Sequence, residues 1–261
     1  MSKRIKIPVR SLGSEVEEPA IPALAAWIAA HRGLEADLIT YQMEESLQVQ
    51  GGVDFPAAGG RFYEPRLIAA IRSINGGVLS GEPALDHRFF IGDAERVVSL
   101  RKGAWCSLPA PHLWGVRDAY YHDTDEFQEA LCRCVGQLLR TMRDRGIKGH
   151  ILLCDEYLEE EIEKLAGPRV LMYTENPHPK GLSILLEHQR SIAVPGERVE
   201  VALSLLDEFD INRLIVVDPS RDVLVRVQSH FDPGSYEVGG YCRKECGGYW
   251  SQLIDSAFII R

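Results

Sequence analysis

The chain has 261 residues, of which 45% are hydrophobic and 26% are charged. These proportions exclude an intrinsically disordered, collagenous or coiled-coil chain. The net charge of -9 disfavours general nucleic-acid binding, which would require an excess of basic residues.

No targeting or membrane-spanning segment is expected. The start, MSKRIKIPVR, is basic, but a proline and an arginine interrupt the apolar region that a secretory signal needs. The most apolar stretch, Ala20 to Ala30, contains Pro22 and is too short to span a membrane. We therefore expect a cytoplasmic protein without a membrane partner. Its six cysteines should then be reduced thiols or metal ligands.

The first 115 residues predict a smaller N-terminal α+β domain or cap. Strands are expected at Ile5–Val9 and Leu38–Tyr41, and helices at Ala23–His31 and Glu64–Ile74. Clusters of glycine and proline separate these segments. We predict two domains, 1–115 and 116–261, joined near residues 110–122.

The second domain opens with a long helix. Asp123 and Glu126 are spaced as a capping box, an apolar stripe follows from Phe127 to Met142, and Gly146 ends the pattern.

Short apolar runs then alternate with helical patterns. The predicted strands are His150–Cys154, Arg169–Thr174, Ser191–Val194, Leu214–Val217 and Tyr236–Val238. Helices are expected between them at 155–166, 182–189, 195–209 and 220–231, with a last helix at 244–258. This alternation is typical of a parallel, three-layer α/β sheet, with a flavodoxin-like or Rossmann-like winding.

In such sheets, ligands bind beyond the carboxyl ends of the strands. The residues at those ends include Asp155 and Glu156 after the first strand, Asn176 after the second and Asp218 after the fourth. Carboxylates here could hold Mg²⁺ for hydrolysis or phosphoryl transfer, with Asp155, Glu156 and Asp218 as catalytic groups. Alternatively, Asp218 simply caps the next helix.

The segment GGYCRKECGGYW, residues 239–250, is the most unusual in the chain. Cys242 and Cys246 are four residues apart, so their sulfurs would share one face at a helix start, where thiolates are favoured. Thiolates bind zinc or iron–sulfur clusters and carry out redox chemistry. Cys106 and His112 would complete a metal site. Alternatively, the cysteines are small buried hydrophobes.

The same segment also allows anion binding. Gly239 and Gly240 would let the backbone approach a ligand, and Arg243 would add positive charge. A turn that needs flexible residues explains the glycines equally well.

Three functional hypotheses follow. We favour a small-molecule or metal site on the carboxyl rim, associated with Cys242 and Cys246 and holding zinc, an iron–sulfur cluster or a redox-active thiol. The second is a divalent-metal-dependent hydrolase or phosphoryl-transfer enzyme that uses rim carboxylates and Mg²⁺. The third is a noncatalytic module that binds an anionic metabolite or assembles into a homo-oligomer.

Overall fold

Eight strands form the centre of the molecule in the computed structural model, which describes residues 4–31, 36–244 and 246–260. In chain order they are β2 (Val9–Ser14), β3 (Ala57–Gly59), β6 (Trp105–Pro109), β8 (His150–Leu153), β9 (Val170–Tyr173), β10 (Ser191–Pro195), β11 (Arg213–Val217) and β12 (Tyr236–Cys242). They pair in parallel within two four-stranded sheets, ordered β10-β11-β12-β2 and β3-β6-β8-β9.

The two sheets meet edge to edge at two junctions, β2 beside β3 and β9 beside β10. Next to β3, the Phe55 N–H donates to the Val9 carbonyl at 3.0 Å, and its carbonyl accepts from the Ser11 N–H at 2.9 Å. At the other junction β9 lies beside β10. One interior apolar cluster draws side chains from around the ring: Leu12, Ala57, Ile151, Leu153, Leu171, Tyr173, Ala193, Ile215, Val217 and Tyr241, with Trp105 packed against it. The strands therefore enclose a barrel.

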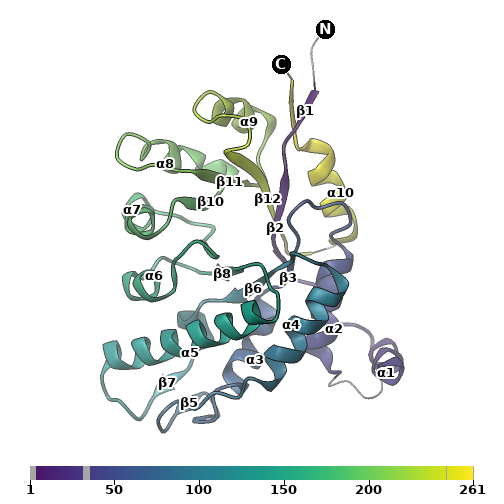
Figure 1. Ribbon diagram of the computed structural model, residues 1–261, viewed down its shortest axis with the longest axis vertical. Coiled ribbons are helices and arrows are strands. Elements are labelled where there is room, and N and C mark those ends of the chain that lie inside the picture. The colour runs from purple at the N-terminus through teal and green to yellow at the C-terminus, as the bar shows by residue number, and fades with distance from the viewer. Residues whose placement is uncertain (1–3, 32–35, 245, 261) are drawn as a thin grey trace.

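Helices cover the outside of the barrel (Figure 1). They are α1 (Ile21–Ala30), α2 (Leu38–Gln48), α3 (Glu64–Ala69), α4 (Arg88–Leu100), α5 (Thr124–Asp144), α6 (Glu159–Leu165), α7 (Pro179–His188), α8 (Val199–Leu203), α9 (Arg221–Gln228) and α10 (Cys246–Ser256). Their inner faces and the outward side chains of the strands form a second, larger core. No helix in the described part of the chain is long and apolar enough to cross a membrane.

Short strands lie outside the barrel. β1 (Arg4–Lys6) pairs antiparallel with β13 (Phe258–Ile260), which brings the two ends of the described chain together (Figure 1). β4 (Ile74–Asn75), β5 (Val78–Leu79) and β7 (Arg117–Asp118) form a separate small sheet.

The predicted α/β class with parallel strands is confirmed, and each of the five strands expected after residue 150 is present. The structure also shows that the strands close into a barrel. A flavodoxin-like or Rossmann-like sheet has two free edges, whereas here β2, β3 and β6 from residues 1–115 fill the gap between β12 and β8. The sheet therefore continues across the expected boundary near residue 115.

Some local predictions were wrong. Leu38–Tyr41 is the first turn of α2 rather than a strand, because the Asp37 side chain accepts a hydrogen bond of 2.9 Å from the Thr40 N–H and caps a helix there. The helix expected to reach Ile74 ends at Ala69. Phe258 belongs to β13, and Glu245, inside the expected last helix, lies outside the described residues.

Candidate functional site

The carboxyl ends of the barrel strands carry a ring of charged side chains, which we call the rim residues. They are Glu15, Arg61, Asp155, Glu175, Glu197, Asp218 and Arg243, which follow β2, β3, β8, β9, β10, β11 and β12. Five carboxylates and two guanidinium groups therefore surround one mouth of the barrel. This mouth is where ligands bind in α/β barrels.

A cavity of about 320 Å³ opens between the ends of β9, β10, β11 and β12. We call it the rim cavity. Its lining includes the predicted Asn176, Asp218 and Arg243, and its full set is Tyr173, Glu175, Asn176, Pro195, Gly196, Glu197, Val217, Asp218 and Arg243. The structure thus brings together residues up to 70 positions apart, from Tyr173 to Arg243.

Asp218 does not cap the helix that follows it. Ser220 caps α9 instead, because its hydroxyl accepts from the Val223 N–H at 3.3 Å. Asp218 adopts a φ of 48°, in the left-handed region that residues other than glycine seldom occupy. Such backbone strain concentrates at functional sites. The helix-cap explanation of Asp218 therefore does not hold.

The Asp218 carboxyl lies in a polar environment with restricted solvation. Tyr249, on α10, donates a hydrogen bond of 2.5 Å to Asp218 Oδ1. Burial raises the pKa of Asp218, and the hydrogen bond from Tyr249 and the charge of Arg243 offset only part of that rise. The residue as a whole is nevertheless exposed. A raised pKa in an accessible cavity suits a group that exchanges protons.

Arg243 forms an ion pair with Glu175 across the rim cavity. Tyr173 also lines the cavity, and burial, followed by the charges of Glu175 and Asp218, raises its pKa. The cavity thus contains three carboxylates and one guanidinium group, and its net charge is negative.

A second group of rim residues lies beside this cavity. Arg61 Nη2 contacts Asp155 Oδ1 at 2.7 Å, and the Arg61 N–H donates to Glu15 Oε1 at 2.6 Å. The Tyr241 hydroxyl also donates to Glu15. The predicted Asp155 is therefore ion-paired, while Glu156 is exposed and does not line the rim cavity.

Sequence reasoning missed Glu15, Arg61, Glu197 and Tyr249. The rule of strand ends would have found Glu15 and Arg61 if β2 and β3 had been recognised as barrel strands. Tyr249 reaches the site from α10, and no sequence signal indicated this contact.

The predicted pair of thiolate ligands is not present. Cys242, at the end of β12, and Cys246, at the start of α10, form a disulfide with Cα atoms 5.7 Å apart. Neither sulfur is therefore available as a thiolate. Their spacing does place the sulfurs together, but it joins them covalently.

The other two predicted metal ligands lie elsewhere. Cys106 is completely buried in the core between the barrel and its helices, where burial raises the pKa of its thiol. His112 contacts the buried Glu161 through Nδ1 at 2.9 Å, and its Nε2 faces the Asp155 N–H at 3.3 Å. Among the described residues, no three His, Cys, Asp or Glu side chains are grouped to hold a metal ion.

Gly239 and Gly240 lie within β12 rather than in a ligand-binding turn. A Cβ on Gly239 would lie 2.6 Å from Ile215 Cγ2, and one on Gly240 would lie 2.5 Å from Leu253 Cδ2. Close packing therefore accounts for both glycines.

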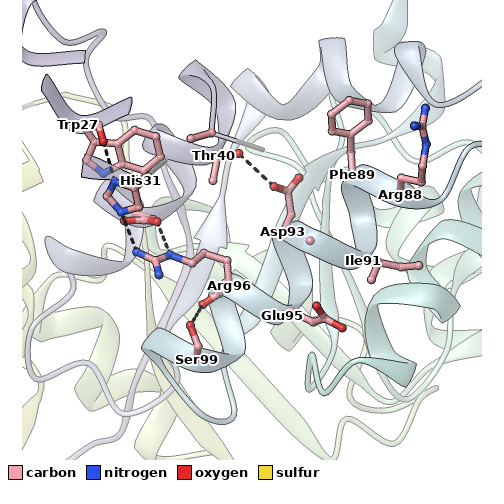
Figure 2. Close-up of a pocket in the computed structure, with 13 residues that line it drawn as sticks. Trp27, His31, Thr40, Arg88, Phe89, Ile91, Asp93, Glu95, Arg96 and Ser99 are labelled. Carbon is pink, nitrogen blue, oxygen red and sulfur yellow. Dashed lines mark hydrogen bonds and ion pairs between the residues drawn. The ribbon is translucent and has the colours of Figure 1, made fainter. Parts of the chain in front are cut away.

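A larger cavity, of about 600 Å³, lies outside the barrel between α1, α2 and α4 (Figure 2). Its buried carboxylates have partners in the fold. Glu44 pairs with Arg96, and Asp93 accepts from Tyr63 at 2.6 Å and from Arg66 at 3.1 Å. These polar groups join helices to one another, so the rim cavity is the stronger candidate site.

No protein-family model and no curated protein sequence matches this chain. Solved structures do share its fold. A B12-independent methionine synthase from Shewanella sp. W3-18-1, in complex with selenomethionine, aligns with a TM-score of 0.65 and 12% identity over 97% of both chains. A methyltransferase from Methanosarcina mazei aligns with a TM-score of 0.58 and 11% identity over 96% of this chain and 94% of that one. A putative vitamin-B12-independent methionine synthase from Listeria monocytogenes aligns with a TM-score of 0.51 and 12% identity over 96% and 94%. At these identities the similarity establishes the fold alone.

Proposed function

We propose that the rim cavity binds a small molecule with an ammonium group and a carboxylate, as an amino acid has. One observation carries this proposal: Glu175, Glu197 and Asp218 converge with a single guanidinium group, that of Arg243, in a cavity of about 320 Å³. An excess of carboxylates attracts a cation, and the arginine supplies a partner for one anionic group.

Each end of the ligand then has a partner. Asp218 and Glu197 would accept hydrogen bonds from the ammonium group. Arg243, which is ion-paired with Glu175, would bind the carboxylate through its remaining N–H donors. Asn176, at the cavity edge, offers both a donor and an acceptor. The Shewanella neighbour was solved with selenomethionine, an amino acid, which supports this class of ligand.

We further propose that the protein is an enzyme in which Asp218 moves a proton. Its raised pKa and its accessible position suit a general acid or base, and Tyr249 holds the carboxyl in one orientation. Because the disulfide occupies both sulfurs, this proposal assigns no chemistry to Cys242 or Cys246.

The second candidate is divalent-metal-dependent hydrolysis or phosphoryl transfer. The acidic rim favours it, since Mg²⁺ needs only one or two carboxylates when a substrate phosphate supplies further oxygens. Asp155 and Asp218 would be the protein ligands, but Asp155 does not line the rim cavity that contains Asp218. We therefore rank this candidate second.

Titration calorimetry with L-methionine and two analogues tests the first proposal. N-acetyl-L-methionine lacks the ammonium group, and 3-(methylthio)propylamine lacks the carboxylate. Saturable binding of L-methionine is expected, with each analogue weakened about tenfold or more by the loss of one charge-assisted contact. Asp218→Asn should weaken amine recognition, and Arg243→Gln should weaken carboxylate recognition.

Asp222→Asn is the matched control, because Asp222 is exposed on α9 and does not line the rim cavity. It should bind as the wild type does. Equal binding of N-acetyl-L-methionine, or undiminished binding by both rim variants, would contradict the proposal. Heat from Mg²⁺ together with a phosphate ester, lost in Asp218→Asn, would favour the second candidate.

A further inference from the structure

A second cavity, of about 560 Å³, opens at the opposite mouth of the barrel, where the strands begin. We call it the basal cavity. It is lined by Arg10 on β2, Trp105 on β6, Gln189 and Arg190 before β10, and Arg213 on β11. No carboxylate is among its lining residues. The basal cavity therefore has a positively charged lining, whereas the lining of the rim cavity is negatively charged.

Positive charge exceeds negative charge around this cavity. Arg10, which is 5% exposed, and Arg213 share one carboxylate, that of Glu237. Arg10 Nε lies 2.5 Å from Glu237 Oε2, and Arg213 Nη1 lies 2.8 Å from Glu237 Oε1. Arg190 has only a long, exposed contact of 3.8 Å with Asp210. The single negative charge of Glu237 thus balances two buried or half-buried cations. One positive charge remains that a further anion could neutralise.

Gln189 provides an independent observation that points to a ligand. Its side chain lines the cavity and is only 6% exposed, and its Nε2 donates to the Ser191 carbonyl at 2.8 Å. Its Oε1 is buried and has no hydrogen-bond partner. Leaving a buried acceptor unpaired costs about 1–3 kcal/mol. Oε1 is shielded from solvent in this conformation, so a ligand with a hydroxyl donor would supply the missing bond once the Gln189 side chain turns toward the cavity.

The surrounding surface would attract an anion. A neighbouring cavity shares Gly167, Pro168 and Val170 with the basal cavity and is lined by four cations, Arg140, Arg143, Lys164 and Arg169, and by no acid. No salt bridge to any of its three arginines occurs within the described part of the chain. In a chain with a net charge of -9, this concentration of cations is a local exception.

A purely structural role explains only part of this arrangement. Arg10 lies over the rings of Phe55 and Trp105, at 4.4 and 4.9 Å from their centroids, and closes the base of the barrel with Glu237. That role accounts for Arg10. It does not account for the unpaired Gln189 Oε1, nor for the second cation, Arg213, on the same carboxylate.

We propose that the basal cavity binds a small phosphorylated molecule with a hydroxyl group. The phosphate would lie against Arg213 and Arg190, and the hydroxyl would donate to Gln189 Oε1 after that side chain turns toward the cavity. A phosphate monoester suits two guanidinium groups better than a carboxylate does, because it carries more charge and offers three oxygens. A concave site on an acidic protein favours a small molecule over a nucleic-acid backbone.

Titration calorimetry with sn-glycerol 3-phosphate, inorganic phosphate and glycerate tests the proposal. Glycerol 3-phosphate should bind most tightly, because it alone combines the phosphate with hydroxyl donors. Arg213→Gln and Arg190→Gln should each weaken it about tenfold. Arg190 is exposed, so its variant should fold normally. Arg198→Gln, an exposed arginine outside the cavity, should bind as the wild type does.

Gln189→Leu isolates the hydroxyl contact. It should bind inorganic phosphate normally but lose the preference for glycerol 3-phosphate. The proposal fails if no phosphate compound binds saturably, if Arg213→Gln and Arg190→Gln bind as tightly as Arg198→Gln, or if glycerate or a single-stranded oligonucleotide binds more tightly than glycerol 3-phosphate.

Discussion

The Tyr249 hydroxyl donates a hydrogen bond of 2.5 Å to Asp218 Oδ1, and so connects the last helix of the barrel to the end of β11. This contact stabilises the charged form of the carboxylate, whereas burial stabilises its neutral form. The pKa of Asp218 therefore depends on both the hydrogen bond from Tyr249 and the burial of the carboxyl.

Removing this hydrogen bond should raise the pKa of Asp218 further. Tyr249→Phe deletes the donor but keeps the ring. The rise in pKa that burial causes is then offset less. A carbon-13 NMR titration of the Asp218 carboxyl measures the change. Tyr120→Phe is the control, since Tyr120 is exposed and does not line the rim cavity. An unchanged or lower pKa in Tyr249→Phe would show that the hydrogen bond does not form in solution.

Asp218→Asn should leave the protein as stable at pH 7, or more stable. A carboxyl whose pKa is raised by folding contributes stability at pH values below its ordinary pKa of 3.8, and that contribution is lost as the pH rises through the raised pKa. The asparagine carries no charge and avoids this loss. Thermal melting at pH 4 and pH 7 should show a smaller pH dependence in the variant. A large loss of stability at pH 7 would instead indicate a structural role.

The disulfide should be detectable by counting thiols. Alkylation of the denatured, unreduced protein should modify four cysteines, namely Cys106, Cys132, Cys134 and Cys154, and prior reduction should add two. Closing so short a loop constrains the unfolded chain, so we expect reduction to lower the free energy of unfolding by about 2 kcal/mol. Six modified cysteines before reduction, together with bound zinc, would restore the thiolate-site hypothesis.

Gly240→Ala should disturb the rim through packing alone. The added Cβ would lie 2.5 Å from Leu253 Cδ2 and 2.7 Å from Tyr249 Oη. We expect a loss of about 1–3 kcal/mol in urea denaturation, with a shift in the Asp218 titration as Tyr249 moves. Gly247→Ala is the control on α10, because its Cβ would meet no atom within 4 Å. Equal stability of the two variants would contradict the packing of β12.

His150 should make the protein sensitive to acid. Both of its ring nitrogens are buried without a partner, and burial, aided by the charge of Arg143, lowers its pKa from 6.5 to about 3. The unfolded chain therefore binds the proton first, so stability should fall as the pH drops from 6.5 towards 3. His150→Leu should reduce this fall in urea denaturation, whereas exposed His178→Leu should not. Parallel pH profiles for wild type and His150→Leu would exclude this explanation.

Local patterns located the strands of the second half of the chain, although the helix expected at 195–209 is only Val199–Leu203. The strands from His150 onward are short apolar runs bounded by turn residues, and caps such as Asp123 and Ser220 use contacts within a few residues. Because parallel strands share one edge, placing polar residues at their ends also identified Asn176 and Asp218 as neighbours, and the glycine-rich segment 239–250 contributed Arg243.

Barrel closure, the disulfide and the role of Tyr249 were decided only by the tertiary structure. Insertions that carry α1, α3 and the small sheet interrupt the strand–helix rhythm in the first half, so β2 and β3 gave little local signal. Closure depends on pairing between segments distant in sequence, such as Arg10 with Phe55. Whether Cys242 and Cys246 bind a metal or each other depends on how β12 and α10 orient their sulfurs, because residue spacing alone is compatible with both.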